Sequence, residues 1–343
     1  MKKTNILIIG TFPGKIGGTT ILVDLLYETL RSNSGEWEVT KIDTGKALYS
    51  LLGSGLIKKT YKSDVVIQNV SCNSFWYSYY LSLLFVVLKK KVCIRFFGGD
   101  AHLISFKNNK IPYGSKKIFI LTETNSNLRA FSSNGFKVFQ VSNFRPVPTR
   151  AIRTSKPSLK RLIFVGQMKL AKGVMDIMEV ARMTPDIDYH FVGPLHWDVT
   201  EQDLANMDNV DYKGLVPLGE TANLFDEYDA LIFPSLYEGE SHAGVVIEAF
   251  SVGLPVICYD WQAITEIVKD GVNGLVTSVN TPQGLKKAID RYYRDINHER
   301  MRIECIKTFN KHHTPGVILQ RHKEILRYMF EAGKEEPPVG YLS

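Results

Sequence analysis

Residues 231–260 constrain the fold of this chain more than any other stretch. The apolar run Leu231–Phe233 predicts a short buried strand, and a polar loop rich in Glu, Gly and Ser follows it. Gly244–Phe250 predicts a helix, which a glycine and a proline end, and Leu254–Cys258 predicts a second buried strand. The three elements form a β-α-β unit whose loop follows the carboxyl end of a strand. Open α/β sheets bind ligands at that end, so this loop is the first candidate for a site.

Two carboxylates stand eight positions apart in this unit. Glu240 lies in the loop, and Glu248 lies one turn into the predicted helix among apolar neighbours. A carboxylate in such surroundings costs free energy unless hydrogen-bond donors satisfy it. A ribose diol offers two donors, and the free N–H groups at a helix start suit a pyrophosphate. The alternative is a buried Glu248 that pairs with an Arg or Lys of the protein itself.

The spacing Glu240-x7-Glu248, within PSLYEG…GVVIEAFSVGLPVI, resembles the donor-nucleotide site of the retaining family 4 glycosyltransferases, which have the GT-B fold. The resemblance implies that Glu248 holds the ribose hydroxyls and that Glu240 contacts the transferred sugar. It also implies that the backbone amides of Gly244, Val245 and Val246 bind the diphosphate. These roles are expectations carried by the resemblance.

Three further positions compare with the family pattern. In the commonest members of the family, the first Glu directly follows a Tyr, as Glu238 follows Tyr237 here. The spacing from Glu238 to Glu248 is ten rather than eight, so we prefer Glu240 as the first motif Glu. Lys172 precedes a Gly as the diphosphate-clamping Lys of the family does. Gln167 stands where the family has an Arg, and this removes one charge from the clamp because Gln cannot offer a charged fork.

The resemblance also suggests neighbours for the nucleotide base. The base stacks near a turn that here follows a predicted strand, and it bonds to backbone rather than to side chains. The residues implied are Gly214, Leu215 and Val216. The sequence therefore leaves the base open, and a UDP-sugar is the donor we favour.

The length of 343 residues exceeds what one hydrophobic core usually holds, so two domains are expected. We predict an α/β GT-B fold, in which two Rossmann-like domains face each other across a cleft. Residues 1–145 are the expected acceptor domain and residues 146–312 the nucleotide-sugar domain. Residues 313–343 are expected to be a helix that crosses back to the first domain, with a loose tail. Prolines rule out a helix in residues 143–148, the expected linker.

The net charge of +7 hides an asymmetry between the two halves. Residues 1–150 carry a net +13 and the remainder a net −6. The basic half suits an anionic membrane surface or a phosphorylated acceptor, and a merely solvated basic surface is the alternative. The segment Phe75–Leu88 is too short to span a bilayer, so we expect a core helix rather than an interfacial one.

The first half offers a few candidate site residues. Gly17 and Gly18 end a glycine-rich turn after the first predicted strand and are expected near the donor's phosphates, although a plain tight turn is the alternative. Asp100 and His102 follow another predicted strand and are candidates for contact with the sugar or acceptor. A helix-capping role is the alternative for Asp100.

The predicted function is retaining transfer of a sugar from a nucleotide-sugar donor to a glycan or lipid-linked acceptor, in surface polysaccharide assembly. Lys172 and the helix amides would stabilise the charge of the leaving diphosphate. The four cysteines lack metal-binding spacing, and we expect no metal or other cofactor. A sugar-nucleotide epimerase of GT-B fold and a non-catalytic module for anionic lipid or nucleic acid remain as alternatives; no nucleic-acid-binding motif is present. No signal peptide is visible, so a cytoplasmic protein is expected, with peripheral membrane contact left open.

Overall fold

A computed structural model describes residues 3–12, 18–33, 35–45, 54–104, 117–149, 158–205, 207–217, 220–331 and 341–342. The chain forms two compact α/β units. The first contains residues 1–144 together with 315–343, and the second contains residues 145–314. The boundaries predicted from the sequence, at 145 and 312, differ from these by two residues or fewer.

The first unit is built on a seven-stranded sheet with the order β13-β6-β5-β4-β3-β1-β2. Six strands run parallel, and β13 pairs antiparallel with β6 at one edge. Parallel strands covered on both faces need continuous apolar runs, and the run Ile6–Ile9 is buried throughout. The strands are β1 (Thr4–Gly10), β2 (Trp37–Asp43), β3 (Val65–Val70), β4 (Lys91–Phe96), β5 (Ile118–Thr122), β6 (Lys137–Gln140) and β13 (Tyr341–Leu342).

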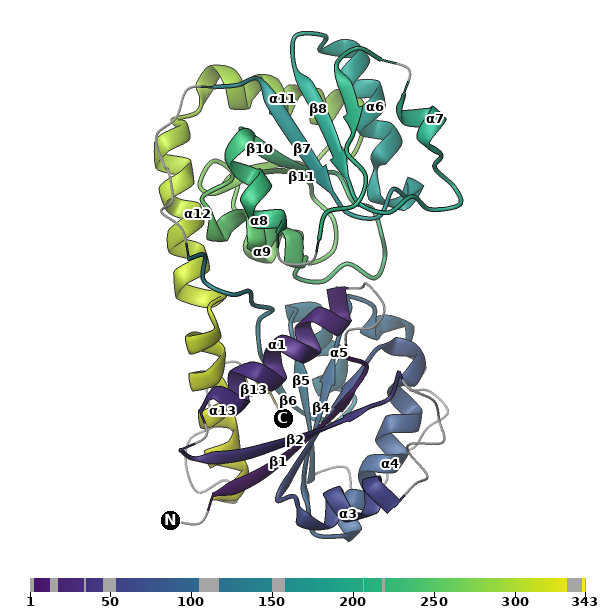
Figure 1. Ribbon diagram of the computed structural model, residues 1–343, viewed down its shortest axis with the longest axis vertical. Helices are drawn as coiled ribbons and strands as arrows, with labels where there is room; N and C mark the ends of the chain where they lie inside the picture. The colour runs from purple at the N-terminus through teal and green to yellow at the C-terminus, as the bar shows by residue number, and fades with distance from the viewer. Residues whose placement is uncertain are drawn as a thin grey trace. The chain divides into compact units, whose positions relative to one another are not determined.

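Helices cover both faces of this sheet (Figure 1). On one face α1 (Gly18–Ser32) and α13 (Pro315–Phe330) bury Leu26 and Ile325 in a shared core. On the other face lie α4 (Phe75–Val87) and α5 (Asn125–Ser133), with α3 (Ser54–Lys62) at its margin. The return of α13 to the first unit agrees with the crossover helix expected from the sequence.

Helix α4 is apolar on both of its faces. Phe75, Tyr79 and Phe85 point into the core, as expected for a helix between two strands. The opposite face exposes large apolar side chains at intervals of three or four residues, which puts them on one side of the helix. These are Tyr77, Tyr80, Leu84 and Val87. The segment therefore combines the core helix that we predicted with the exposed apolar face of the interfacial alternative.

The second unit has a six-stranded parallel sheet with the order β12-β11-β10-β7-β8-β9. The strands are β7 (Arg161–Val165), β8 (Asp188–Val192), β9 (Val210–Tyr212), β10 (Ala230–Phe233), β11 (Val256–Tyr259) and β12 (Gly274–Thr277). The helices are α6 (Val174–Met183), α7 (Glu201–Leu204), α8 (Thr221–Leu224), α9 (Gly244–Ser251), α10 (Ile264–Ile267), α11 (Pro282–Asp295) and α12 (His298–His312). The β-α-β unit predicted for residues 231–260 is β10-α9-β11.

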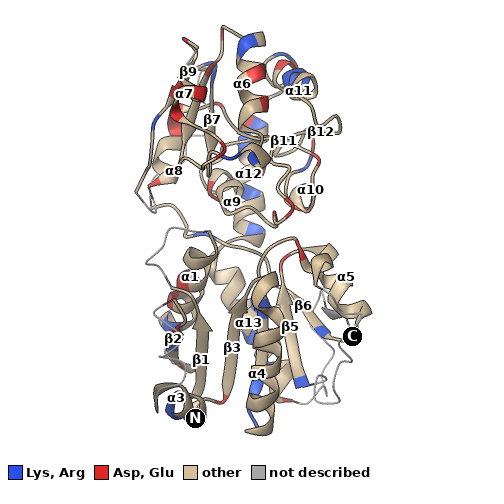
Figure 2. Ribbon diagram, turned by 90° about the vertical axis from the view of Figure 1, so that its right-hand side faces the viewer, with Lys and Arg blue, Asp and Glu red and all other residues tan. Residues whose placement is uncertain are grey.

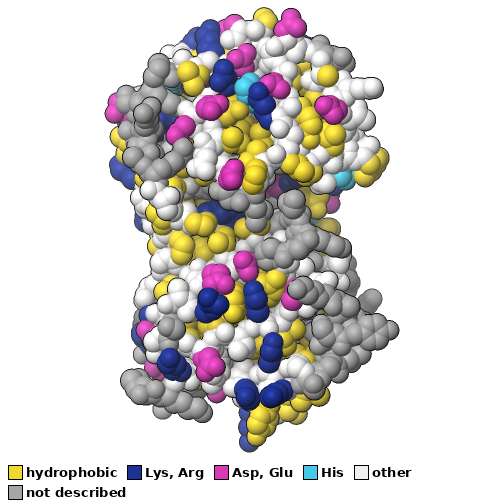
Figure 3. All heavy atoms as spheres, viewed as in Figure 1, with side chains coloured by type: hydrophobic (Ala, Val, Ile, Leu, Met, Phe, Trp, Pro, Cys, Tyr) yellow, Lys and Arg dark blue, Asp and Glu magenta, His cyan; other side chains and the backbone are white. Residues whose placement is uncertain are grey.

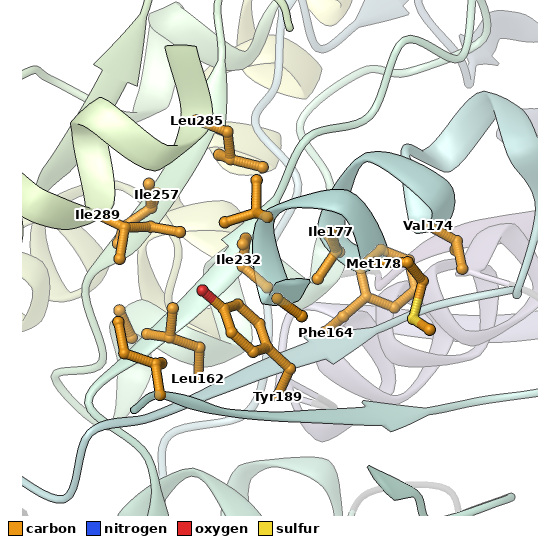
Figure 4. Close-up of a cluster of buried hydrophobic side chains, with 14 of the residues drawn as sticks. Leu162, Phe164, Val174, Ile177, Met178, Tyr189, Ile232, Ile257, Leu285 and Ile289 are labelled. Atoms are coloured by element: carbon orange, nitrogen blue, oxygen red, sulfur yellow. The ribbon is translucent and has the colours of Figure 1, made fainter. Parts of the chain in front are cut away.

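Two buried clusters sandwich this sheet. Figure 4 shows one of them, where Leu162 and Tyr189 of the strands meet Ile177 of α6 and Leu285 of α11. The other cluster packs α9 and α12 against the opposite face. Figure 2 marks the charged residues, with acidic positions on α7 and basic positions on α3. Helix α12 was not predicted, because its apolar stripe is only Met301, Cys305 and Phe309 in an otherwise charged sequence.

Two general findings bear on function. Among the described residues, no helix is long and apolar enough to cross a membrane. The cysteines are unpaired thiols, and Cys93, Cys258 and Cys305 are buried. Burial raises the pKa of the Cys93 thiol to about 12, so this thiol stays protonated and inert at neutral pH.

Candidate functional site

The strand order of the second unit indicates where a ligand can bind. Strand order reverses between β7 and β10: the chain runs outward from β7 through β8 and β9, and outward from β10 through β11 and β12. The loops that leave the carboxyl ends of β7 and β10 therefore diverge, and such a switch point is where open α/β sheets bind ligands. These two loops contain Gln167, Lys172, Glu240 and the start of α9.

A glycine holds the two loops against each other. Gly173 ends the short 3₁₀ turn Leu170–Lys172 with a φ of 75°, in the left-handed region that favours glycine. A Cβ atom at position 173 would overlap the carbonyl oxygen of Pro234. The amide of Leu236 donates to the carbonyl of Ala171 at 2.9 Å, which joins the loops a second time. Lys172 is thereby fixed beside the loop that follows β10.

Lys172 forms an ion pair with Glu240. Both side chains are largely buried, and the Lys172 ammonium also lies 4.7 Å from the centre of the Tyr237 ring. Glu240 Oε2 is buried and has no hydrogen-bond partner among the described residues. Glu238, the weaker candidate for the first motif acid, is exposed. Glu240 is therefore the acid that this loop turns toward the Lys172 cation.

Glu248 pairs with a residue that the sequence did not single out. Arg145 Nε donates to Glu248 Oε1 at 2.6 Å, and the side chains are 6% and 23% exposed. This is the alternative pairing for Glu248 that the sequence left open. Little in the sequence indicated that Arg145 would be the partner, because Arg145 lies 103 positions from Glu248, in the segment predicted only as a linker.

The Arg145 guanidinium lies over the first turn of α9. A Cβ atom at Gly244 would overlap it, so a side chain at this position would require the guanidinium to move. The backbone amide of Arg145 donates to the carbonyl of His313 at 3.1 Å, which anchors the residue. The amide of Val246, one of three expected to bind the diphosphate, donates to the carbonyl of Ala243 at 3.1 Å.

A buried histidine steadies the loop between Glu240 and α9. His242 Nε2 lies 3.2 Å from Glu266 Oε2, and the His242 side chain is almost fully buried. The sequence analysis did not single out His242. Because His242 lies two residues before Gly244, its contact with Glu266 helps to fix the backbone at the start of α9.

The turns after β7, β8 and β9 are joined by backbone hydrogen bonds. The amide of Gly166 donates to the carbonyl of Val192 at 2.9 Å, and that of Gly193 donates to Gly214 at 2.9 Å. Gly193 has a φ of 138°, and a Cβ atom there would overlap the Gly166 carbonyl oxygen. The expected base neighbours Gly214, Leu215 and Val216 thus belong to the same row of turns as Gln167, which is exposed.

The sequence also offered candidates in the first unit, where Asp100 and His102 follow β4 and Gly18 begins α1. Asp100 precedes the short 3₁₀ helix Ala101–Leu103, but its side chain does not cap that helix. Asp100 Oδ1 is buried without a hydrogen-bond partner among the described residues, and burial raises the pKa of this carboxyl. His102 and Gly18 are exposed, and Gly17 lies outside the described residues.

The first unit contains a pocket of about 290 Å³. It lies at the carboxyl ends of β1 and β3, which is the switch point of this sheet, since β2 continues from β1 on one side and β4 from β3 on the other. None of the described residues that line it is charged. Hydroxyl groups dominate its polar lining, and they come from Thr11, Thr19, Thr44, Ser71, Ser74, Tyr77 and Ser78.

The second unit resembles a known protein family in sequence. Residues 149–308 match the family described as Glycosyl transferases group 1. The Anabaena protein Alr3699/HepE, solved in complex with UDP, superposes with a TM-score of 0.74 at 14% identity and covers 94% of this chain and 100% of its own. The chain therefore has the GT-B fold predicted from the sequence.

Sequence relatives cover shorter stretches. A D-inositol 3-phosphate glycosyltransferase of Paenarthrobacter aurescens is 24% identical over 204 residues, which are 55% of this chain and 49% of the relative. An uncharacterized 41.2 kDa protein in the cps region of Klebsiella pneumoniae is 29% identical over 133 residues, 38% of this chain and 36% of its own length. The chain thus matches half or less of the length of these curated relatives.

Proposed function

We propose that this protein is a glycosyltransferase that moves a sugar from a nucleotide-sugar donor to a glycan or lipid-linked acceptor, with retention of the anomeric configuration. The observation that carries the proposal is the arrangement at the β7/β10 switch point, where each motif carboxylate lies beside a cation. Glu240 pairs with Lys172, and Glu248 pairs with Arg145. Carboxylates bind sugar and ribose hydroxyls, and cations bind a diphosphate, so this set suits both parts of a nucleotide sugar.

The roles within the site follow from the chemistry of each group. Transfer breaks the bond between the anomeric carbon and the diphosphate oxygen, so negative charge grows on the leaving group. Lys172 and the amides at the start of α9 would stabilise that charge. Glu240 Oε2, which has no hydrogen-bond partner in the described part of the chain, would accept a hydroxyl of the transferred sugar, and Glu248 would accept the ribose hydroxyls. A UDP-sugar is the donor we propose, in keeping with the UDP bound by the Anabaena relative.

The pocket of the first unit is the proposed place for the acceptor. Its neutral, hydroxyl-rich lining suits the hydroxyl groups of a sugar rather than a phosphate. Asp100, buried and with a raised pKa, is a further candidate for acceptor contact. A pocket of this kind favours transfer over epimerisation of the donor, since an epimerase needs no acceptor.

The proposal includes contact with an anionic membrane through the α3–α4 surface, defined as Ile57, Tyr61, Tyr77, Tyr80, Leu84 and Val87, all exposed. Lys90 Nζ donates to the Tyr61 carbonyl at 2.7 Å, which brings the ends of α3 and α4 together. Lysines at positions 58, 59, 62, 89 and 91 accompany these apolar side chains. Figure 3 shows hydrophobic and basic side chains together at the end of the first unit where α3 lies. Apolar side chains ringed by lysines suit a lipid surface.

A relative encoded in a cps region supports surface polysaccharide assembly as the setting. The test of the proposed function is a thermal-shift screen against UDP, GDP, ADP, TDP and their common sugars. A ligand that binds the native state raises the melting temperature by mass action. We expect UDP and one UDP-sugar to raise it, and the shift to vanish in Glu248→Ala. If no nucleotide raises the melting temperature, the donor site and the proposed activity are both rejected.

Product analysis tests the finer points. With the donor from the screen and a panel of glycan acceptors, NMR of the product should show the donor's own anomeric configuration. A product of inverted configuration would reject retention while leaving transfer intact. Conversion of the donor sugar to an epimer in the absence of acceptor would favour the epimerase instead.

A further inference from the structure

We propose that the pocket of the first unit binds one uncharged sugar unit, the terminal unit of the acceptor, through the side-chain oxygens of Gln68 and Asn69. The inference rests on the proposed function and deepens it, because it names the class of acceptor that the pocket selects. It starts from the hydrogen bonds that these two side chains make and from those that they lack. Both residues lie near the end of β3 and line the pocket.

The orientation of the Asn69 amide follows from the bond that it makes with β1. Asn69 Nδ2 donates to the carbonyl oxygen of Ile9 at 3.1 Å. A carbonyl oxygen only accepts hydrogen bonds, so the NH₂ group must lie on the Ile9 side and the amide oxygen on the other. That oxygen, Asn69 Oδ1, is buried and has no hydrogen-bond partner among the described residues.

A glycine on the neighbouring strand makes room for the Asn69 side chain. Gly10 ends β1, and a Cβ atom there would lie 3.1 Å from Asn69 Cβ and 3.1 Å from Val23 Cγ1. Such close packing leaves the Asn69 amide little room to turn. Its oxygen therefore stays directed away from Ile9.

Gln68 is held in the same way on the opposite face of the sheet. Its Nε2 donates to the carbonyl oxygen of Ser78 at 3.0 Å and to the hydroxyl oxygen of Ser82, both on α4. The side chain is buried, and no group in the described part of the chain donates to Gln68 Oε1. Successive residues of a strand point to opposite faces, so Gln68 and Asn69 line the pocket from the two sides of the sheet.

Two amide oxygens without donors define the chemistry of the ligand. An interior oxygen to which no group donates costs free energy, so the favoured ligand carries O–H or N–H donors. Phosphate, sulfate and carboxylate groups carry acceptors at neutral pH and would meet these oxygens with like charge. The hydroxyls of an uncharged sugar both donate and accept, and they also suit the Ser and Thr hydroxyls of the lining.

The volume of the pocket limits the length of the ligand. At about 290 Å³ it lies at the lower end of the range of about 300–1,000 Å³ for pockets that enclose small molecules. One sugar ring suits this volume, and a longer saccharide would extend out of it. Val23, Leu81 and Phe97 add apolar surface for the C–H groups of the ring. We therefore expect an acceptor that ends in a sugar and carries any phosphate or lipid further along.

Two other occupants compete with an acceptor sugar. Ordered water would satisfy both oxygens, and the pocket would then select no ligand. The transferred sugar of the donor has the same hydroxyl chemistry as an acceptor sugar. The experiment has to separate an acceptor sugar from both.

The probes are the methyl glycosides of glucose, galactose, mannose and N-acetylglucosamine, because each is a single uncharged sugar unit. Ligand-observed NMR with the full chain, in the presence of UDP, gives their dissociation constants. The best probe is then compared with analogues in which fluorine, which cannot donate a hydrogen bond, replaces one hydroxyl at a time. Its uronic acid serves as the anionic analogue.

The variants are Gln68→Met and Asn69→Leu, which keep the approximate size of each side chain and remove the amide oxygen. Asn134→Leu is the matched control. Asn134 Nδ2 also donates to a backbone carbonyl, that of Ala130 at 2.8 Å, but Asn134 lies at the end of α5 and not among the residues that line the pocket. The ligand-free melting temperature of each variant is recorded first, to verify folding.

We expect at least one methyl glycoside to bind, and fluorine at one or two positions to weaken its binding about tenfold. The uronic acid should also bind at least about tenfold more weakly. Gln68→Met and Asn69→Leu should each weaken the probe about tenfold while the dissociation constant of UDP stays within about twofold of the wild type. Asn134→Leu should change neither constant.

Several results would overturn the inference alone. These are no binding of any methyl glycoside, equal binding of all the fluorinated analogues, binding of the uronic acid as tight as that of the probe, and wild-type probe binding by both pocket variants. Variants that weaken a UDP-sugar but not UDP would place the transferred sugar in the pocket, which also overturns it.

Failure of the proposed function gives a different result. A wild-type protein that binds a methyl glycoside but no nucleotide would reject sugar transfer and leave the pocket as a sugar site. The fluorinated analogues are measured on the wild type, so this readout remains if a variant folds poorly.

Discussion

Lys172 and Glu240 are held together across the switch point, although 68 residues separate them in the chain. The pair joins the loop that follows β7 to the loop that follows β10. It sets a cation beside an acid whose second oxygen, Oε2, is buried without a partner among the described residues. Removing the Lys172 ammonium would therefore leave the Glu240 carboxylate without its ion-pair partner.

Lys172→Ala should lower the rate of sugar transfer at least about a hundredfold. The reason is the loss of the charge that stabilises the leaving diphosphate, an effect of the size seen when an oxyanion contact is removed. Lys169→Ala is the matched control, because Lys169 also lies over the Tyr237 ring, at 4.9 Å, but forms no ion pair with Glu240 or Glu248 among the described residues. The measurement is turnover with the donor that the screen identifies. A full rate in Lys172→Ala would mean that another group bears the charge.

Glu248→Ala should abolish donor use, while Glu238→Ala should leave it close to the wild-type level. Glu248 is bonded to Arg145 at the start of α9, whereas Glu238 is exposed. Donor binding by calorimetry and turnover together check the expectation. Undiminished turnover in Glu248→Ala would refute the ribose assignment, and a large loss in Glu238→Ala would reopen the choice of the first motif acid.

Gly173→Ala should reduce the free energy of unfolding by about 2–4 kcal/mol. The added Cβ would overlap the Pro234 carbonyl oxygen, and the residue also has a positive φ. Gly271→Ala separates these two causes. Gly271 has a φ of 71°, but its Cβ would meet only the end of the Arg291 side chain, at 3.4 Å.

The control variant should therefore cost about 1 kcal/mol, the price of the backbone conformation alone. Denaturant unfolding of both variants gives the comparison. Equal losses in Gly173→Ala and Gly271→Ala would mean that the contact between the two loops adds nothing to stability.

Asp100→Asn should raise the melting temperature at pH 8 and leave it nearly unchanged at low pH. Burial raises the pKa of the Asp100 carboxyl in the folded protein above its unfolded value. The favourable contribution of the protonated carboxyl is therefore fully present below the unfolded pKa and is lost as pH rises through the folded pKa.

The amide cannot ionise, so this pH-dependent loss should disappear in Asp100→Asn. Melting curves between pH 4 and pH 8, together with turnover, test it. A gain in stability accompanied by a loss of activity would indicate a functional carboxylate. A variant that is less stable at every pH would contradict the expected cost of the buried charge.

Leu84→Ser combined with Val87→Ser should weaken binding to anionic vesicles. Both residues belong to the exposed face of α4, so the change removes apolar area from the α3–α4 surface and leaves the core intact. Wild-type binding should also fall as salt rises, because lysines supply part of the attraction. Trp197→Ser is the control, since Trp197 is strongly exposed in the second unit. Binding is measured by co-sedimentation with vesicles. If the double variant binds as well as the wild type, the α3–α4 surface is not the membrane-binding surface.

Local patterns were enough to predict the β10-α9-β11 unit, and the resemblance of the same residues to a glycosyltransferase family implied the GT-B fold. A glycine, a run of apolar residues and a proline determine where a strand or helix ends, and these signals lie within a few residues of each other. The same holds for Lys172, whose Gly173 neighbour marks the turn. Residue types at short spacing thus pointed to both loops of the switch point.

Such local patterns could not predict which side chains form ion pairs within the site. Arg145 and Glu248 meet only after the sheet of the second unit has formed, and nothing near Arg145 in the sequence points to an acid 103 positions later. Helix α12 escaped prediction for a related reason. It needs only a narrow stripe of apolar residues, because α9 covers it on one side alone.

Helix α13 fixes the order in which the two units can mature during synthesis. Ile318, Ile325 and Met329 of this helix belong to the same core as Leu22 and Leu26 of α1. The second unit has all of its strands and helices once residue 314 has been made. The first unit, although its strands are synthesised earlier, keeps an uncovered apolar face until residues 315–330 leave the ribosome. The half of the protein that is translated first is therefore the half that is finished last.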